Sequence, residues 1–341
     1  MWYNMLMSED ALNWPKIGNE KAVEFLRRVA EAGQPAQAYV FLGQDDLGKS
    51  TIALTFARQL MAASYSGRDE LNADLHILKP EEGKKSISIE QVRELIKSLQ
   101  LGSFLDSYKI GLVKEADTLT AEAQSALLKT LEEPEEKVVL ILLADSEESL
   151  LPTILSRAQK LYFQSVPAET IYDYLIAQHN VQRPLAKDLA NIALGRPLKA
   201  VRFLENPDLY TAYLAKAAIL LQFFAADVNR RLTGLDQMMS DRTYSAAAVA
   251  AAEEIILMFE GLLRDLFLLH FNQPEKIQHS ALKDELEKVR QELERLSAVN
   301  SGQDNFSIFL LQRFKLAAMA REYLAANVNP RLVLEQLCIN L

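Results

Sequence analysis

Cysteine and histidine are scarce in this sequence, which limits its covalent and metal chemistry. The single cysteine, Cys338, cannot form an intramolecular disulfide, and a zinc site built from several cysteines is excluded by count. The four histidines show no spacing typical of metal ligands; they are His76, His179, His270 and His279. We therefore expect a protein without a metal site, and without zinc in particular.

Long apolar runs and an excess of basic residues are also missing. No apolar run reaches the roughly 18–20 residues that a membrane-spanning helix needs. The N-terminal stretch carries acids where a signal peptide carries basic residues. The net charge of −9 is opposite in sign to that of proteins that bind DNA non-specifically by themselves. These features predict a cytoplasmic protein with no membrane contact. If the protein touches DNA, it does so through a local patch or through partners.

Short aliphatic runs alternate with amphipathic stretches in the first half of the chain. Such runs read as buried strands, and the stretches between them repeat their apolar residues at helical spacing. Strands that alternate with helices predict a largely parallel sheet, and thus an α/β fold. The predicted strands are 38–42, 75–78, 110–113 and 138–143, and the predicted helices between them are 50–63, 89–99 and 121–131.

The second half of the chain shows helical spacing without a strand pattern. Residues 165–207 read as short helices punctuated by Gly195 and Pro197, which suits a small helical lid. Beyond residue 207 the leucines and other apolar residues recur at steps of three or four. The predicted domains are an α/β domain at 1–164, a helical lid at 165–207 and an all-α domain at 208–341.

The clearest motif is a phosphate-binding loop, Gly43-Gln-Asp-Asp-Leu-Gly48-Lys49-Ser50. A predicted strand leads into it and a predicted helix leads out, so that backbone N–H groups and the helix N-terminus can face phosphate oxygens. Lys49 would contact the β- and γ-phosphates of ATP, and Ser50 would ligate Mg²⁺ if a nucleotide binds. The predicted nucleotide-binding residues are Gly43, Gly48, Lys49, Ser50 and Thr51.

Acidic residues oppose nucleotide binding in this loop. Asp45 and Asp46 add negative charge where an anion must fit, so the loop either binds ATP weakly or is kept for its shape alone. A working ATPase of this kind needs an acid after a buried strand to hold Mg²⁺. Lys114 occupies that position and Glu115 the position of the water-activating residue, unless the register slips and Asp117 serves as the metal ligand.

An ordered set of motifs resembles a known family. Glu115-Ala-Asp-Thr-Leu-Thr, Ala126-Leu-Leu-Lys-Thr-Leu-Glu-Glu-Pro134 and Pro152-Thr-Ile-Leu-Ser-Arg157 follow one another as in the clamp-loader AAA+ family. The chain is most similar to the bacterial delta-prime branch of DNA polymerase III clamp loaders. The resemblance covers residues 10–205 firmly and the remainder loosely. It implies an AAA+ P-loop domain, a small helical lid and an all-α C-terminal collar that joins subunits.

The resemblance also implies roles for individual residues. Arg157 matches the arginine finger, which acts in trans on the γ-phosphate bound by a neighbouring subunit. Lys199, or Arg196 as the other candidate, falls near the second sensor in the lid. Asp145 falls near the first sensor, where an uncharged polar residue is more usual. The segment 61–73 stands where relatives carry a four-cysteine zinc module, so this lineage has lost the module or is a more distant relative.

Three functions follow from these patterns. The favoured one is a delta-prime-like subunit in a hetero-pentameric ring with gamma/tau and delta type subunits, which loads the sliding clamp onto primer-template DNA and has weak or no ATPase of its own. The second is an active gamma/tau-type ATPase, indicated by the intact Gly-Lys-Ser. The third is a nucleic-acid protein that acts alone through a small basic cluster, Lys79, Lys84 and Lys85.

Overall fold

The computed structural model describes residue 14 and residues 17–62, 74–81, 83–84, 86–101, 107–133, 135–239, 245–297 and 305–341. These residues pack as two compact units, which we call the α/β unit and the helical unit. The α/β unit contains the described residues up to His179 together with Gly195–Lys199. The helical unit contains Asn180–Leu194 and the described residues of Ala200–Leu341. The three-domain division made from the sequence stays a prediction.

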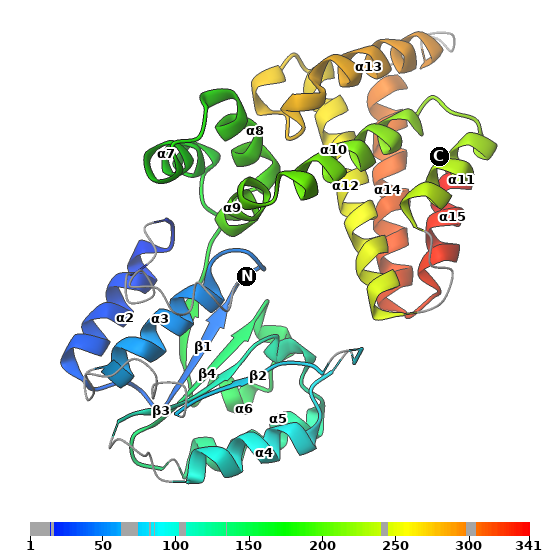
Figure 1. Ribbon diagram of the computed structural model, residues 1–341. Helices are drawn as coiled ribbons and strands as arrows, with labels where there is room; N and C mark the ends of the chain where they lie inside the picture. The colour runs from blue at the N-terminus through cyan, green and yellow to red at the C-terminus, as the bar shows by residue number, and fades with distance from the viewer. Residues whose placement is uncertain are drawn as a thin grey trace. The chain divides into compact units, whose positions relative to one another are not determined.

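The α/β unit is built on a five-stranded sheet in the order β2-β3-β4-β1-β5, and every pair of neighbouring strands is parallel (Figure 1). The α/β class and the largely parallel sheet predicted from the sequence are confirmed. The strands are β1 (Ala38–Leu42), β2 (Leu75–Leu78), β3 (Lys109–Val113), β4 (Val138–Ala144) and β5 (Gln159–Tyr162).

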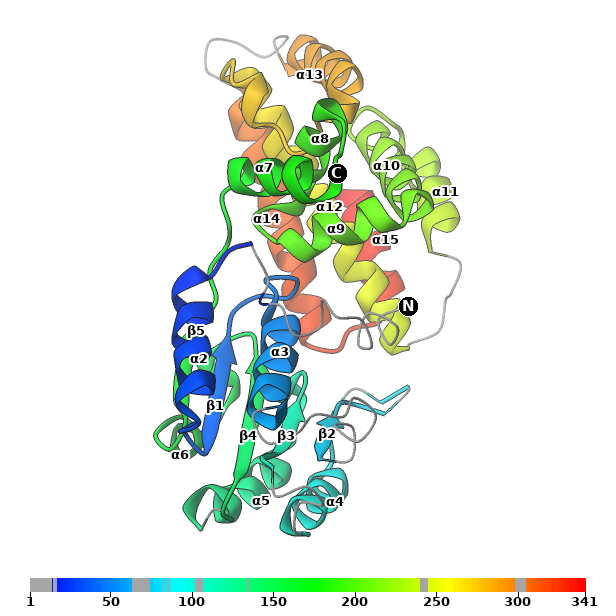
Figure 2. The same ribbon diagram turned by 60° about the vertical axis from the view of Figure 1, so that its left-hand side comes forward.

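Helices cover both faces of this sheet, as Figures 1 and 2 show. The helices of the unit are α2 (Glu20–Ala32), α3 (Lys49–Ala62), α4 (Ile89–Gln100), α5 (Ala121–Glu132), α6 (Pro152–Leu155) and α7 (Ala168–His179). On one face, α2 and α3 bury Leu26 and Phe56 against Tyr39 and Phe41 of β1. On the other face, α4 and α5 bury their apolar residues against the alternate residues of β1 and β4. Burial on both faces explains why β1, β3 and β4 are apolar without a break.

β5 was not predicted from the sequence. It pairs only with β1 among the described strands and so forms an edge of the sheet. Its sequence, Gln-Lys-Leu-Tyr, leaves the first and last residues exposed. An edge strand with polar residues lacks the continuous apolar run that identified the other four.

The helical unit is all-α, as the sequence predicts for the C-terminal half. Its helices are α8 (Arg183–Ala193), most of α9 (Pro197–Glu205), α10 (Pro207–Gln222), α11 (Val228–Met238), α12 (Ala246–His270), α13 (Lys283–Ser297), α14 (Asn305–Ala325) and α15 (Pro330–Asn340). The long helix α12 is the centre of this unit and packs against α10, α13, α14 and α15. No described helix is long and apolar enough to cross a membrane.

A buried polar network fixes α12 in place. The Asp265 carboxylate accepts hydrogen bonds from the N–H groups of Gln278 and His279 at 2.6 and 2.8 Å. It also lies 2.7 Å from Nδ1 of His279, whose Nε2 lies 2.9 Å from the Tyr213 hydroxyl. Gly261 leaves room for this network, because a Cβ there would lie 2.6 Å from Oε1 of Gln278. His279, one of the four histidines that show no metal-ligand spacing, is therefore a buried structural residue.

Candidate functional site

The loop 43–48 joins β1 to α3 at the carboxyl end of the sheet (Figure 1). Gly43 and Gly48 have φ angles of 143° and 97°, which side chains with a Cβ rarely adopt. A Cβ on Gly43 would lie 2.4 Å from the carbonyl oxygen of Phe163. The N–H of Gly43 donates to the carbonyl of Ala144, the last residue of β4, at 3.2 Å. This strand–loop–helix arrangement has the shape of a phosphate-binding loop at a helix N-terminus.

Lys49, the first residue of α3, is buried and its ammonium group is engaged within the chain. Nζ donates to the carbonyl of Gly43, to the carbonyl of Ala144 at 3.0 Å and to Oδ1 of Asp145 at 2.9 Å. An ammonium group has three N–H donors, and three acceptors surround it here. Ser50 and Thr51 follow in the first turn of α3 and are half-buried.

Carboxylates from three segments surround this lysine. Asp45 lies in the loop, Asp117 follows β3 and Asp145 follows β4. Partial burial, and then the charge of Asp145, raises the pKa of Asp45. Partial burial is also the main cause of the raised pKa of Asp117, to which Asp145 again contributes, while Lys49 lowers it. Both shifts favour the neutral carboxyl group relative to a fully exposed aspartate, first because burial disfavours the charged form and then because Asp145 adds charge of the same sign.

The charged residues after β3 have different neighbours: Lys114 lies near Lys79, whereas Asp117 lies near Lys49. Burial, and then the charge of Lys79, lowers the pKa of Lys114, so Lys114 is next to another lysine. Asp117, the second candidate for the metal position, lies in the 3₁₀ helix η2 (Ala116–Thr118) and interacts with Lys49 and Asp145. Burial and then Asp45 raise the pKa of Glu115. Within the described residues, no three His, Cys, Asp or Glu side chains are placed to hold a metal ion.

These residues fit a magnesium–nucleotide poorly. The loop has the right backbone shape, but the lysine that should contact phosphate already has three acceptors, one of them a carboxylate. The neighbouring carboxylates add charge of the same sign as phosphate. We therefore derive no hydrolytic step at this site.

The predicted second-sensor segment lies beside the loop. The N–H of Leu198 donates to the carbonyl of Asp46 at 3.1 Å, which ties the start of α9 to the phosphate loop. Arg196 and Lys199 flank this contact, and both are half-buried. The N–H of Lys199 donates to the carbonyl of Arg196 at 3.0 Å, so the two candidates belong to one turn.

Arg157 follows the short helix α6 and is partly exposed. Nη2 lies 2.8 Å from Oε1 of Glu132, at the end of α5. Nη1 donates to the carbonyl of Thr153 at 3.1 Å and lies 3.4 Å from the Ser156 hydroxyl. The hydrogen bonds of the Arg157 guanidinium thus go to α5 and to its own segment. The exposed fraction of its side chain is 37%, so it is accessible to another molecule.

Gln124, which the sequence analysis did not single out, fixes the position of α6. Its side chain is buried and donates to the carbonyl of Ser149 at 3.0 Å, and it accepts from the N–H of Leu151 at 2.8 Å. Leu151 is the residue before α6. A glutamine on the apolar face of a predicted helix, next to Ala123 and Leu127, was the signal that could have identified it. Glu132 was also missed, although it lies in the Leu-Glu-Glu-Pro motif.

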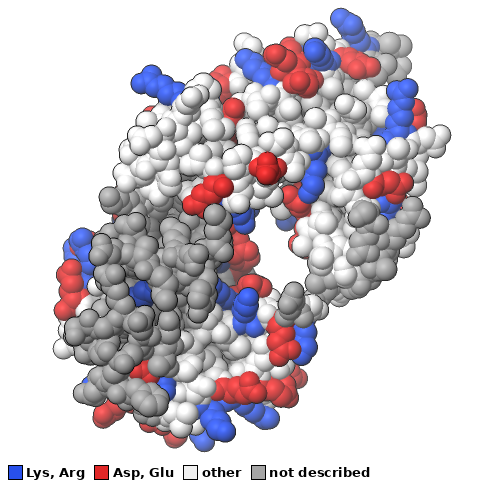
Figure 3. Space-filling model, in the orientation of Figure 1, with Lys and Arg blue, Asp and Glu red and all other residues white. Residues whose placement is uncertain are grey.

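The predicted basic cluster is only partly described, since Lys85 lies outside the described residues. Lys84 pairs with Glu81 at 2.5 Å. On the face drawn in Figure 3, acidic and basic side chains are interspersed among the described residues.

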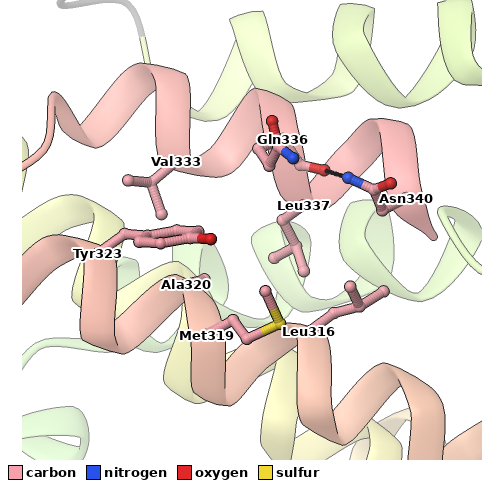
Figure 4. Close-up of a pocket in the computed structure, with 8 residues that line it drawn as sticks. All are labelled: Leu316, Met319, Ala320, Tyr323, Val333, Gln336, Leu337 and Asn340. Carbon is pink, nitrogen blue, oxygen red and sulfur yellow. Dashed lines mark hydrogen bonds between the residues drawn. The ribbon is translucent and has the colours of Figure 1, made fainter.

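A pocket of about 150 Å³ lies between α14 and α15 in the helical unit (Figure 4). Its polar groups are amides and one phenol; Asn340 Nδ2 donates to the carbonyl of Gln336 at 2.8 Å. The lining has no Asp, Glu, Lys, Arg or His; it consists of Leu316, Met319, Ala320, Tyr323, Val333, Gln336, Leu337 and Asn340.

Comparison with known proteins bears on the α/β unit. Residues 18–167 match the family model described as DNA polymerase III, delta subunit. The DNA polymerase III subunit delta′ of Pseudomonas aeruginosa is 35% identical over 183 residues, which are 50% of this chain and 56% of the relative. The delta′ subunit of Bacillus subtilis is 28% identical over 197 residues, 53% of this chain and 59% of the relative. The chain thus spans little more than half the length of these relatives.

Two further similarities accompany these. The tau/gamma subunit of Haemophilus influenzae is 28% identical over 194 residues, which are 52% of this chain and 28% of that protein. The solved structure of a gamma-subunit-related protein from Thermotoga maritima has a TM-score of 0.49 and 17% identity, with 93% of this chain and 97% of that one covered. From the match over residues 18–167 and the similarity to several delta′ subunits, the resemblance of this chain to clamp-loader delta-prime subunits is confirmed.

Proposed function

We propose that this chain is a delta-prime-type subunit of a DNA polymerase III clamp loader that presents Arg157 to the ATP of a neighbouring subunit. Its partners are gamma/tau and delta type subunits in a hetero-pentameric ring, and through that ring the sliding clamp and primer-template DNA. It works in the cytoplasm and has weak or no ATPase of its own. The family match supports the assembly, and the exposed Arg157 supports the role within it.

The single observation that carries the proposal is the contrast between two cations. Lys49 is buried and has three acceptors in its own chain. Arg157 is exposed, and its guanidinium is held by one surface carboxylate and two weaker neutral acceptors. Exposed ion pairs are worth roughly 0.2–1 kcal/mol, so a phosphate from another subunit can replace Glu132. A charged, planar guanidinium suits that contact.

The test is the ATPase of the assembled clamp loader, stimulated by clamp and primer-template DNA, with Arg157→Ala in this chain. An arginine finger is worth roughly 10³–10⁵ in kcat at the site it serves. The variant should therefore lose that one site's share of the turnover while the ring still assembles. Arg28→Ala is a matched control, because Arg28 also forms a surface pair of 2.8 Å with a glutamate, Glu24. An unchanged rate in Arg157→Ala rings would count against the proposal.

The second candidate is an active gamma/tau-type ATPase, favoured by the intact loop geometry of Gly43 and Gly48. Purified full-length chain should then hydrolyse ATP, and Lys49→Ala should abolish the turnover. Under the favoured proposal, by contrast, we expect no ATP turnover above background from the unsubstituted chain or from Lys49→Ala.

A further inference from the structure

The three acceptors around Lys49 differ in how they depend on the sequence. Two are backbone carbonyls, of Gly43 and Ala144, which almost any sequence with this fold would supply. The third is the Asp145 carboxylate, and it alone brings a charge and a specific side chain. The choice of residue 145 therefore decides whether the ammonium group of Lys49 is neutralised within the chain.

The position of Asp145 is set by the sheet. Ala144, the residue before it, ends β4 and pairs with Leu42, the last residue of β1. The N–H of Gly43 donates to the Ala144 carbonyl at 3.2 Å, which joins the loop to this strand end. Asp145 thus follows directly from a strand end that is paired with β1, and its carboxylate, with a side chain that is 56% exposed, lies beside the phosphate loop.

Asp45 and Asp117, the other acids near the loop, do not contact Lys49 as Asp145 does. Asp45 and Asp117 interact with Lys49 through their charges, and neither forms a described hydrogen bond to Nζ. Asp145 contacts Nζ at 2.9 Å and is also one of the charges felt by both other acids. One residue thus combines direct contact with the charge that makes the site unfavourable for anions.

We infer that Asp145 is the residue that excludes nucleotide phosphates from this phosphate loop: its carboxylate takes the place beside Lys49 that a phosphate oxygen would occupy. The ligand class excluded is a nucleoside di- or triphosphate. A phosphate that reaches Lys49 must compete with this charged hydrogen bond, which is about twice as strong as a neutral one. The Lys49 side chain is only 7% exposed, against 37% for Arg157, so its ion pair is screened less by solvent than the Arg157–Glu132 pair. This inference deepens the proposed function and rests on its claim that the chain has weak or no ATPase of its own.

The test is titration of the full-length chain with a fluorescent ADP analogue, and with the matching ATP analogue and Mg²⁺. Asp145→Asn keeps an oxygen acceptor for Lys49 but removes the charge. Because the exchange replaces a charged hydrogen bond by a neutral one, binding should tighten about tenfold relative to the unsubstituted chain. Asp145→Ser is a second variant, in case the amide still blocks the loop.

Two controls separate contact from general charge. Glu148→Gln removes one negative charge three residues away, where Glu148 is exposed and its hydrogen-bond partner is Ser146; it should change the affinity less than twofold. Lys49→Ala in the Asp145→Asn background should abolish the gain. Equal gains from Glu148→Gln and Asp145→Asn would overturn the inference.

The outcomes distinguish this inference from the proposed function. If Asp145→Asn and Asp145→Ser fold with an unchanged melting temperature but bind no more tightly, Asp145 is not the excluding residue, and the role of Arg157 is unaffected. If Arg157→Ala leaves the assembled ATPase unchanged while Asp145→Asn gains affinity, the role proposed for Arg157 fails and the inference about Asp145 stands.

Discussion

At the scale of single residues, the charges around Lys49 are the feature that bears on anion binding by the α/β unit. The site holds the carboxylates of Asp45, Asp117 and Asp145 near one ammonium group. The motif was predictable from the sequence, because glycine, lysine and serine have fixed roles in such loops. The Lys49–Asp145 contact was not, because it joins residues 96 positions apart and depends on β1 lying beside β4.

Asp117→Asn should stabilise the α/β unit at neutral pH. Partial burial first, and the charge of Asp145 next, raises the pKa of Asp117 above its ordinary value of 3.8. A raised carboxyl pKa favours folding while the group is protonated, and this contribution is lost as the pH rises through the folded-state pKa. Asparagine imitates the protonated form at every pH. The free energy of unfolding should therefore rise at pH 7 by up to about 1 kcal/mol, the range for exposed charges.

The measurement is urea unfolding of both proteins at pH 7 and near pH 4, followed by tryptophan fluorescence. The difference should shrink toward pH 4, where the wild-type carboxyl group is increasingly neutral. Glu94→Gln, in the exposed middle of α4, serves as a control for the loss of one surface charge. A difference that grows toward low pH would contradict the sign of this prediction.

At the level of elements, the short helix α6, which precedes Arg157, is positioned by the longer helix α5. α6 has only one turn and ends next to Arg157, and it is held by α5 at two points, through Gln124 and through Glu132. The long helices and apolar strands were predictable, because their periodicity is repeated over many residues. β5 and the α5–α6 contacts were not, because an exposed strand and a single buried glutamine leave no periodic signal.

Gln124→Met should loosen α6 while preserving the size of the side chain. It removes hydrogen bonds to the Ser149 carbonyl and the Leu151 N–H, and leaves these backbone groups without that partner. Losing one side of such buried bonds costs about 1–3 kcal/mol. Chemical unfolding should show this loss. Ser125→Ala is the neighbouring control, since its exposed hydroxyl bonds only within α5, to Ala121, and it should change stability by about 0.5 kcal/mol or less.

The whole molecule consists of two units with separate cores. The α/β unit is held by two apolar layers on a parallel sheet, and the helical unit by α12 and its buried Asp265–His279 network. Sequence composition predicted this difference in class, since β-branched runs stop before residue 165. It could not predict that Asn180–Leu194 pack with the helical unit. There Ser280 donates to Asp188 at 2.6 Å, far along the chain from α8.

The single cysteine gives this architecture a reporter that needs no engineering. Cys338 lies in α15, is buried, and burial raises the pKa of its thiol to about 12. Since thiolates are the reactive species, a folded helical unit should react slowly with a thiol reagent. Trp14 packs against the core of the α/β unit, so its fluorescence, measured with Trp2→Phe to remove the second tryptophan, reports on that unit. We expect thiol labelling and fluorescence to give different urea midpoints, and coincident curves would mean that both units unfold together.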